Sequence, residues 1–140
     1  MAIKSKKIKL TPRERQKHRI RQRVSGSAEC PRLSVYKSSK HTYAQIVCDV
    51  SGKTIASAST LDAEVVGEVE KVISSRPENE AGNAVKSSKG VNAARAVGIV
   101  LARRVKEKKI ERAVFDRNGF IYCGRVQAVA DGARAGGLKF

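Results

Sequence analysis

The first 24 residues, MAIKSKKIKLTPRERQKHRIRQRV, carry ten lysines and arginines and a single acid, Glu14. Their apolar residues are too few and too scattered to form a core face, and ten like charges repel one another. The segment therefore cannot supply a hydrophobic core. We expect it to be largely disordered alone and to order when phosphates neutralise it. Any core has to come from the remaining residues.

A helix is expected inside this segment. Thr11-Pro12 has the pattern of a helix start, with threonine as the N-cap and proline at the first helical position. We therefore predict an extended tail followed by a helix over about 12–24. Ser25-Gly26-Ser27 is expected to be a hinge, so that residues 1–26 form a basic N-terminal arm and residues 27–140 a single domain.

The charge of the whole chain indicates a polyanionic partner. The chain has 29 Lys and Arg against 13 Asp and Glu, a net charge of +16, and a pI of about 10.3. Nucleic acid is the first candidate and an anionic membrane surface the second. The sequence contains no run of about 18 apolar residues, so no membrane-spanning helix is expected. The basic N-terminus lacks the apolar stretch of a signal peptide, so export is not expected.

Catalytic and metal-binding patterns are missing from the sequence. Cys30, Cys48 and Cys123 lie far apart, and His18 and His41 stand at no metal-ligand spacing from them. There is no P-loop and no H-E-x-x-H. We predict no enzymatic activity, no metal, no cofactor and no small-molecule substrate.

Strand patterns dominate the first half of the domain. Three short segments have strand patterns and are separated by polar loops, as in an antiparallel meander. They are RLSVYK (32–37), YAQIVCDV (43–50) and TIASAS (54–59). Valines and Ile73 recur at helical spacing after residue 62, and that helix should stop near Ser74-Ser75.

Helical patterns dominate the second half of the domain. A helix from about Gly90, capped by Ser87 or Ser88, is followed by a short strand over 113–115 and a helix over 125–135. The predicted fold is therefore α/β: a three-stranded antiparallel meander extended by a strand after a crossover helix, with the helices packed on the sheet. The acidic segment at about 62–86 should face away from a polyanion.

We expect nucleic acid to be contacted by the arm, by the loop between the first two strands and by a turn near the C-terminus. The loop KSSKHTY offers cations, hydroxyls, an imidazole and a ring, although an ordinary polar hairpin would look the same. The predicted contacts are Lys4, Lys6, Lys7, Lys9, Arg13, Arg15, Lys17, Arg19, Arg21, Arg23, Arg32, Lys37, Ser38, Ser39, Lys40, His41, Tyr43, Arg117, Tyr122 and Arg125.

The turn lies in VFDRNGFIYCGRV (114–126), which holds three of the chain's six Phe and Tyr residues. Asn118-Gly119 predicts a tight turn. If residues 120–122 are extended, Phe120 and Tyr122 share a face, and one ring could stack on a base. The alternatives are that Phe115 and Phe120 belong to the core, which we favour, and that Arg117 pairs with Asp116 or Asp131. We favour RNA over DNA because no helix shows a face of base-reading side chains.

The blocks RLSVYKSSKHTYAQIV (32–47), SAST (57–60) and FDRNGFIYCGRVQAVADGAR with a terminal GL.F (115–140) resemble the family of large-subunit ribosomal protein eighteen. The resemblance implies a non-enzymatic constituent of the large ribosomal subunit in the cytoplasm. It would bind 5S rRNA and help attach it to 23S rRNA in the central protuberance, beside other large-subunit proteins. A general DNA-compacting protein and a small RNA nuclease or RNA-modifying enzyme remain the alternatives.

Three features depart from the family pattern. The segment from Asp62 to Lys86 looks longer than usual, so its acidic helix inherits no role. Cys123 stands where histidine is common, and Ala135 where glutamate is frequent. An imidazole contact at position 123 is therefore not expected in this chain.

Overall fold

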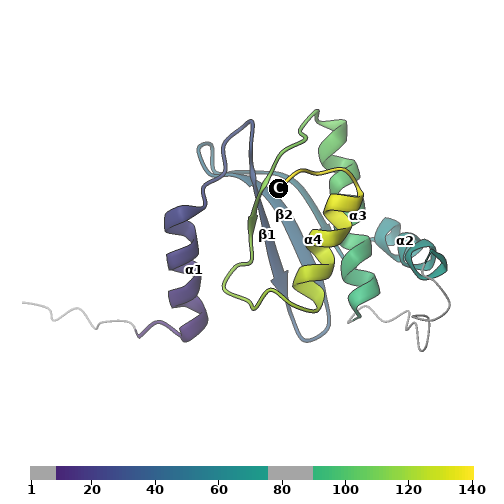
Figure 1. Ribbon diagram of the computed structural model, residues 1–140, viewed down its shortest axis with the longest axis horizontal. Helices are drawn as coiled ribbons and strands as arrows, with labels where there is room; N and C mark the ends of the chain where they lie inside the picture. Colours follow the sequence, from purple (N-terminus) through teal and green to yellow (C-terminus); the bar gives the residue numbers. More distant parts are fainter. Residues whose placement is uncertain (1–8, 76–89) are drawn as a thin grey trace, which may run out of the picture.

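The computed structural model describes residues 9–75 and 90–140 (Figure 1). Within these ranges the element order is α1 (Pro12–Arg23), β1 (Arg32–Lys37), β2 (Thr42–Cys48), β3 (Lys53–Ser59), α2 (Ala63–Ser74), α3 (Val91–Glu107), β4 (Val114–Asp116) and α4 (Arg125–Ala135). This is the α/β class that the sequence predicts. The expected loop over 78–90 lies almost wholly outside the described residues, as do Ser87 and Ser88.

The sheet has the strand order β3-β2-β1-β4. Strands β1, β2 and β3 form the predicted antiparallel meander, and β4 lies parallel to β1 after the α3 crossover. Leu33 and Val35 pair with Ile46 and Ala44, and all four side chains are buried. Because side chains alternate along a strand, the residues that alternate with them, such as Ser34 and Tyr36 on β1, lie on the other face.

Helices α3 and α4 cover the Leu33 face of the sheet and enclose the core (Figure 1). They approach each other closely at two glycines. A Cβ on Gly98 would lie 2.2 Å from the Val129 carbonyl oxygen, and one on Gly132 would lie 2.1 Å from the Arg95 carbonyl oxygen. Only residues without a side chain allow the middle of α4 to lie this close to α3.

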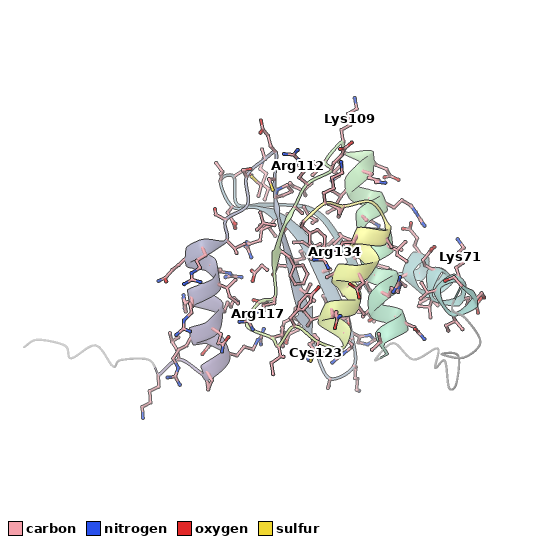
Figure 2. The ribbon with its side chains drawn as sticks, in the orientation of Figure 1. Lys71, Lys109, Arg112, Arg117, Cys123 and Arg134 are labelled. Atoms are coloured by element: carbon pink, nitrogen blue, oxygen red, sulfur yellow. The ribbon has the colours of Figure 1, made fainter. Side chains whose placement is uncertain are left out.

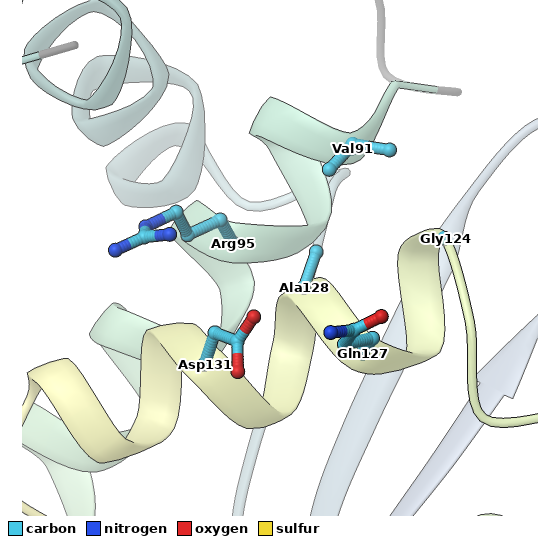
Figure 3. Close-up of a pocket in the computed structure, with 6 residues that line it drawn as sticks. All are labelled: Val91, Arg95, Gly124, Gln127, Ala128 and Asp131. Carbon is cyan, nitrogen blue, oxygen red and sulfur yellow. The ribbon is translucent and has the colours of Figure 1, made fainter.

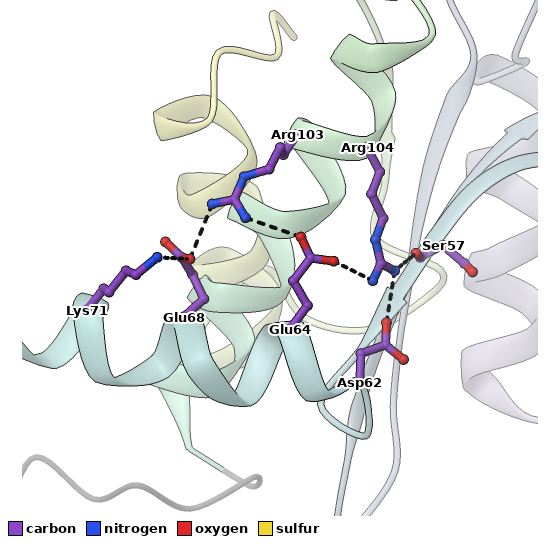
Figure 4. Close-up of polar contacts among 7 residues, drawn as sticks. All are labelled: Ser57, Asp62, Glu64, Glu68, Lys71, Arg103 and Arg104. Carbon is purple, nitrogen blue, oxygen red and sulfur yellow. Dashed lines mark hydrogen bonds and ion pairs between the residues drawn. The ribbon is translucent and has the colours of Figure 1, made fainter.

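The basic residues of α3 contact the edge strand β3. The Arg104 guanidinium donates a 2.6 Å hydrogen bond to the Ser57 carbonyl, and Lys108 donates to the Ile55 carbonyl. Arg104 also pairs with Asp62, at 2.9 Å, and with Glu64, at 2.8 Å (Figure 4). These contacts join α3, the edge of the sheet and the start of α2.

The predicted start of α1 is confirmed. The Thr11 hydroxyl accepts from the Glu14 N–H, and the Glu14 carboxylate accepts from the Thr11 N–H at 2.7 Å, which forms a capping box. The backbone N–H of Thr11, followed by its hydroxyl, lowers the pKa of Glu14. Helix α3, in contrast, begins after Gly90, which has no side chain to act as the expected serine cap.

Two boundaries differ from the sequence prediction around Gly26. Strand β2 ends at Cys48 rather than at residue 50, because the Asp49 carboxylate turns to accept from the Gly26 N–H at 2.7 Å. Gly26 is also buried, and a Cβ there would lie 2.5 Å from the Arg32 nitrogen. The hinge predicted at residues 25–27 is therefore wrong: this segment is fixed against β1 and β2.

Candidate nucleic-acid interface

Three segments that are distant in the sequence meet at one end of the domain. The Arg125 guanidinium donates to the Ser38 carbonyl at 2.9 Å and to the His41 carbonyl at 3.4 Å, which joins the start of α4 to the loop between β1 and β2. The Arg117 guanidinium donates to Gln16 Oε1 at 2.9 Å, which joins the C-terminal turn to α1. Figure 2 shows Arg117 between α1 and the sheet.

Helix α1 docks on this turn through Arg13. The Arg13 guanidinium lies over the Phe120 ring, 3.9 Å from its centroid, and 5.3 Å from the Tyr36 centroid. Gly119 has a φ of +79°, and a Cβ there would lie 2.6 Å from the Arg13 carbonyl oxygen. A glycine is therefore required at this position twice over, for its backbone conformation and for the close approach of α1.

The side of α1 turned away from the domain is strongly positive. Arg15, Arg19 and Arg23 are exposed and follow one another at intervals of four residues, so they form a stripe along one helix face. Burial, followed by the charges of Arg21 and Arg13, lowers the pKa of Lys17. Cations that depress one another's proton affinity are stabilised by a bound anion, as a phosphate backbone would provide.

The loop between β1 and β2 is held in shape by its own polar groups. The Ser38 hydroxyl accepts from the His41 N–H at 2.9 Å and from the Lys40 N–H at 3.3 Å. The His41 ring contacts the Thr60 hydroxyl at 3.0 Å. Ser39 and Lys40 are exposed, while Lys37 and Tyr43 are half-buried. The loop is therefore an ordered surface before any ligand binds.

One residue predicted to contact RNA is used inside the protein. The Arg32 side chain is only 9% exposed and bonds to Asp116 at 2.7 Å and to both carboxylate oxygens of Asp49. Arg21 approaches Asp116 at 3.8 Å. The structure therefore gives Arg32 a role inside the protein, because two carboxylates already satisfy its guanidinium below the surface.

The C-terminal turn also differs from its prediction. The ring of Phe120 contacts Tyr36 and Arg13, whereas the ring of Tyr122 contacts Phe115 edge-on, so the two side chains do not share a face. Phe115 and Phe120 are partly buried against the core rather than enclosed in it. Arg117 bonds to Gln16 and to the Phe120 carbonyl, and not to Asp116 or Asp131. Tyr122 is 40% exposed, and its hydroxyl accepts a hydrogen bond from the Arg134 guanidinium.

The predicted arm residues are divided between the described and undescribed parts of the chain. Lys4, Lys6 and Lys7 lie outside the described residues, and Lys9 is exposed just before α1.

The acidic residues of α2 lie at the other side of the molecule (Figure 1). There Glu64 and Glu68 pair with Arg103, each at 3.2 Å (Figure 4). The acidic helix α2 thus lies on the opposite side of the molecule from α1.

The sequence profile of the family described as ribosomal L18 of archaea, bacteria, mitochondria and chloroplasts matches residues 7–140. The chain belongs to this family.

Several members of the L18 family are similar over nearly the whole chain. The large ribosomal subunit protein uL18 of Pediococcus pentosaceus is 46% identical over 136 residues, which are 97% of this chain and 98% of the relative. That of Desulfatibacillum aliphaticivorans is 46% identical over the full length of both chains. That of Desulfovibrio desulfuricans is 51% identical over 91% of this chain and 93% of the relative. The family consists of structural proteins of the large ribosomal subunit, and the chain is not an enzyme.

One hollow in the described surface is smaller than a typical small-molecule site. The hollow between the first turns of α3 and α4 measures about 170 Å³ (Figure 3), smaller than the ~300–1,000 Å³ of ligand pockets. Its lining is Val91, Arg95, Gly124, Gln127, Ala128 and Asp131. Residues 9–75 and 90–140 contain no cluster of three metal-ligating side chains, and none of their helices is long and apolar enough to cross a membrane.

Sequence reasoning missed two contributors to this end of the domain. Tyr36 is 45% exposed and contacts Tyr43 and Phe120, and the alternation of RLSVYK, which buries Leu33 and Val35, could have placed it on the open face. Gln16 orients Arg117, and no local pattern indicates a contact between residues 101 positions apart.

Proposed function

We propose that this protein is a constituent of the large ribosomal subunit that binds 5S rRNA and helps attach it to 23S rRNA in the central protuberance. Its neighbours there would be other large-subunit proteins, and its location the ribosome of the cytoplasm. Membership of the L18 family supports the ribosomal assignment. The observation that carries RNA binding is the meeting of α1, the Lys37–Tyr43 loop and the Arg117–Arg125 turn at one end of the domain.

Each part of this surface suits a different part of folded RNA. The stripe Arg15, Arg19 and Arg23 presents point charges along about two turns of helix, which suits successive phosphates. The hydroxyls and exposed rings beside it suit 2′-OH groups and unpaired bases. Because Arg125 and Arg117 fix the loop and the turn by internal hydrogen bonds, the surface has a defined shape, which favours recognition of one RNA fold.

Salt dependence tests the electrostatic part of the proposal. In gel-shift titrations of 5S rRNA, contact with about six phosphates predicts a slope of log K against log salt of roughly −4 to −5. Replacing Arg15, Arg19 and Arg23 by alanine should flatten the slope by about 2 to 3, because three phosphate contacts are lost. The control variant Lys71→Ala/Arg103→Ala changes cations on the acidic side and should leave the slope unchanged.

Competition tests the specific part of the proposal against the alternative of a general nucleic-acid-binding protein. We expect an excess of tRNA or duplex DNA to compete at least tenfold less effectively than unlabelled 5S rRNA at 150 mM salt. Equal competition by tRNA and by DNA would contradict 5S recognition and favour the alternative.

A further inference from the structure

A polar groove lies on the sheet face opposite α3 and α4. It runs over β2 and β3, has a volume of about 160 Å³, and is lined by Tyr43, Gln45, Ser57, Ser59 and Asp62 together with Ala44 and Ala58. The strand register explains the groove, because Tyr43 pairs with Ser59 and Gln45 with Ser57. Two long side chains on β2 thus stand beside two short ones on β3, the edge strand.

The groove opens directly beside the candidate RNA interface. Tyr43 is both its aromatic wall and the last residue of the Lys37–Tyr43 loop. The Tyr43 ring lies 6.0 Å from the Tyr36 ring and 6.4 Å from the His41 ring, the latter edge-on. His41 is in turn held by Thr60 at 3.0 Å. The ring is therefore fixed before RNA arrives, which lowers the entropy lost on stacking.

The polar lining suits a base better than a phosphate. Gln45 and Ser57 are exposed and offer both donors and acceptors. The Asp62 carboxylate accepts from Arg104 at 2.9 Å (Figure 4). It also accepts from the Ser59 hydroxyl at 3.4 Å. The N–H groups on the pairing edge of a base can donate to this carboxylate, whereas a phosphodiester has no hydrogen to donate to it.

We propose that this groove binds one unpaired nucleobase of the bound RNA, stacked at Tyr43 with its pairing edge towards Gln45, Ser57 and Asp62. The inference rests on the proposed RNA-binding function and adds a base-specific contact to it. The stripe on α1 neutralises phosphates, whereas the groove admits only a base that is free of a pairing partner.

Three substitutions in the full-length protein test the groove. Ser57→Leu fills it from an exposed position on β3, and Thr54→Leu is the matched control, because Thr54 is exposed on the same strand and does not line the groove. Loss of one base–aromatic stack corresponds to roughly a 5- to 150-fold lower affinity. We expect Ser57→Leu and Tyr43→Ala to weaken 5S rRNA binding within that range, and Thr54→Leu to bind like wild type.

Chemical footprinting supplies a readout that does not depend on affinity. In the wild-type complex, at least one unpaired base should be protected from a reagent that attacks the pairing edge, and Ser57→Leu at saturating concentration should restore its reactivity. If wild type prefers 5S rRNA to tRNA while Ser57→Leu and Thr54→Leu share its affinity and footprint, the groove proposal is overturned and the proposed function stands. If wild type itself shows no preference for 5S rRNA, the proposed function fails.

Discussion

Replacement of Arg32 by methionine separates a role in folding from a role in RNA binding. Arg32 Nη1 donates to Asp116 Oδ2 at 2.7 Å, and Nε and Nη2 donate to Asp49 at 2.9 and 2.8 Å. The Asp116 side chain is fully buried, and its remaining close partner is the Asn118 N–H at 2.8 Å. Methionine fills much of the same volume and removes the cation, so Asp116 would be left as a buried carboxylate.

The expected loss of stability follows from this geometry. Removing one partner of a buried ion pair costs about 3–5 kcal/mol, because the other charge stays desolvated. Arg21 lies 3.8 Å from Asp116, but its side chain is 42% exposed, so it offsets little of this cost. We therefore expect Arg32→Met to lower the free energy of unfolding by about 3 kcal/mol. That is equivalent to a fall in Tm of roughly 10 °C for a chain of this length.

Thermal and urea unfolding followed by circular dichroism measure this loss, and gel shifts below the Tm measure binding. We expect 5S rRNA affinity of the folded variant to stay within about twofold of wild type. Asp116→Asn in the wild-type and Arg32→Met backgrounds completes a double-mutant cycle. The double variant should lose less unfolding free energy than the sum of the losses in the two single variants. A stability loss under about 1 kcal/mol combined with a large loss of affinity would refute the internal role of Arg32.

Two further perturbations test the same framework. The hydrogen bond from Arg32 lowers the pKa of Asp49 from 3.8 to about 2. A carboxyl whose pKa is lower in the folded than in the unfolded state stabilises the fold above its unfolded pKa. Stability should therefore be lost as pH falls from about 4 to about 2. Acid titration by circular dichroism should show this loss in wild type and a smaller one in Arg32→Met, and identical profiles would contradict the assignment. Gly119→Ala should detach α1, since a Cβ would meet the Arg13 carbonyl at 2.6 Å, and should speed hydrogen exchange over residues 12–23. The control Gly52→Ala has a similar positive φ of +68° with no atom within 4 Å of its Cβ, so it should leave α1 protected; equal exchange in both variants would exclude the docking contact.

The local signals in the sequence were sufficient for most of the elements. Thr11-Pro12 marks the start of α1, the alternation around Leu33 and Ile46 marks the meander, and the helix predicted over 125–135 coincides with α4. Each of these depends on capping, pairing or side-chain period within a few residues. The end of β2 was misplaced because Asp49 is drawn to Gly26 and Arg32, 23 and 17 positions away.

Predictions of the site were less complete for the same reason. Composition identifies cations, but not which ones find a carboxylate in the folded chain, and Arg32 pairs with a residue 84 positions away. The docking of Arg13 on Phe120 and the groove beside Tyr43 likewise depend on segments that meet only in the folded state. Residue type therefore predicted the kind of partner, while long-range pairing decided which side chains remain available for it.

The bonds from Arg104 and Lys108 to the β3 carbonyls have a consequence for how the protein behaves before it meets RNA. An outer strand with vacant backbone groups is a template on which another polypeptide can add, and this leads to fibrils and precipitates. Here two outward carbonyls, those of Ser57 and Ile55, are already occupied by positively charged side chains. An incoming strand would have to displace the Arg104 and Lys108 side chains from these carbonyls. The edge of β3 is therefore protected against pairing with the edge of another copy of this highly charged chain.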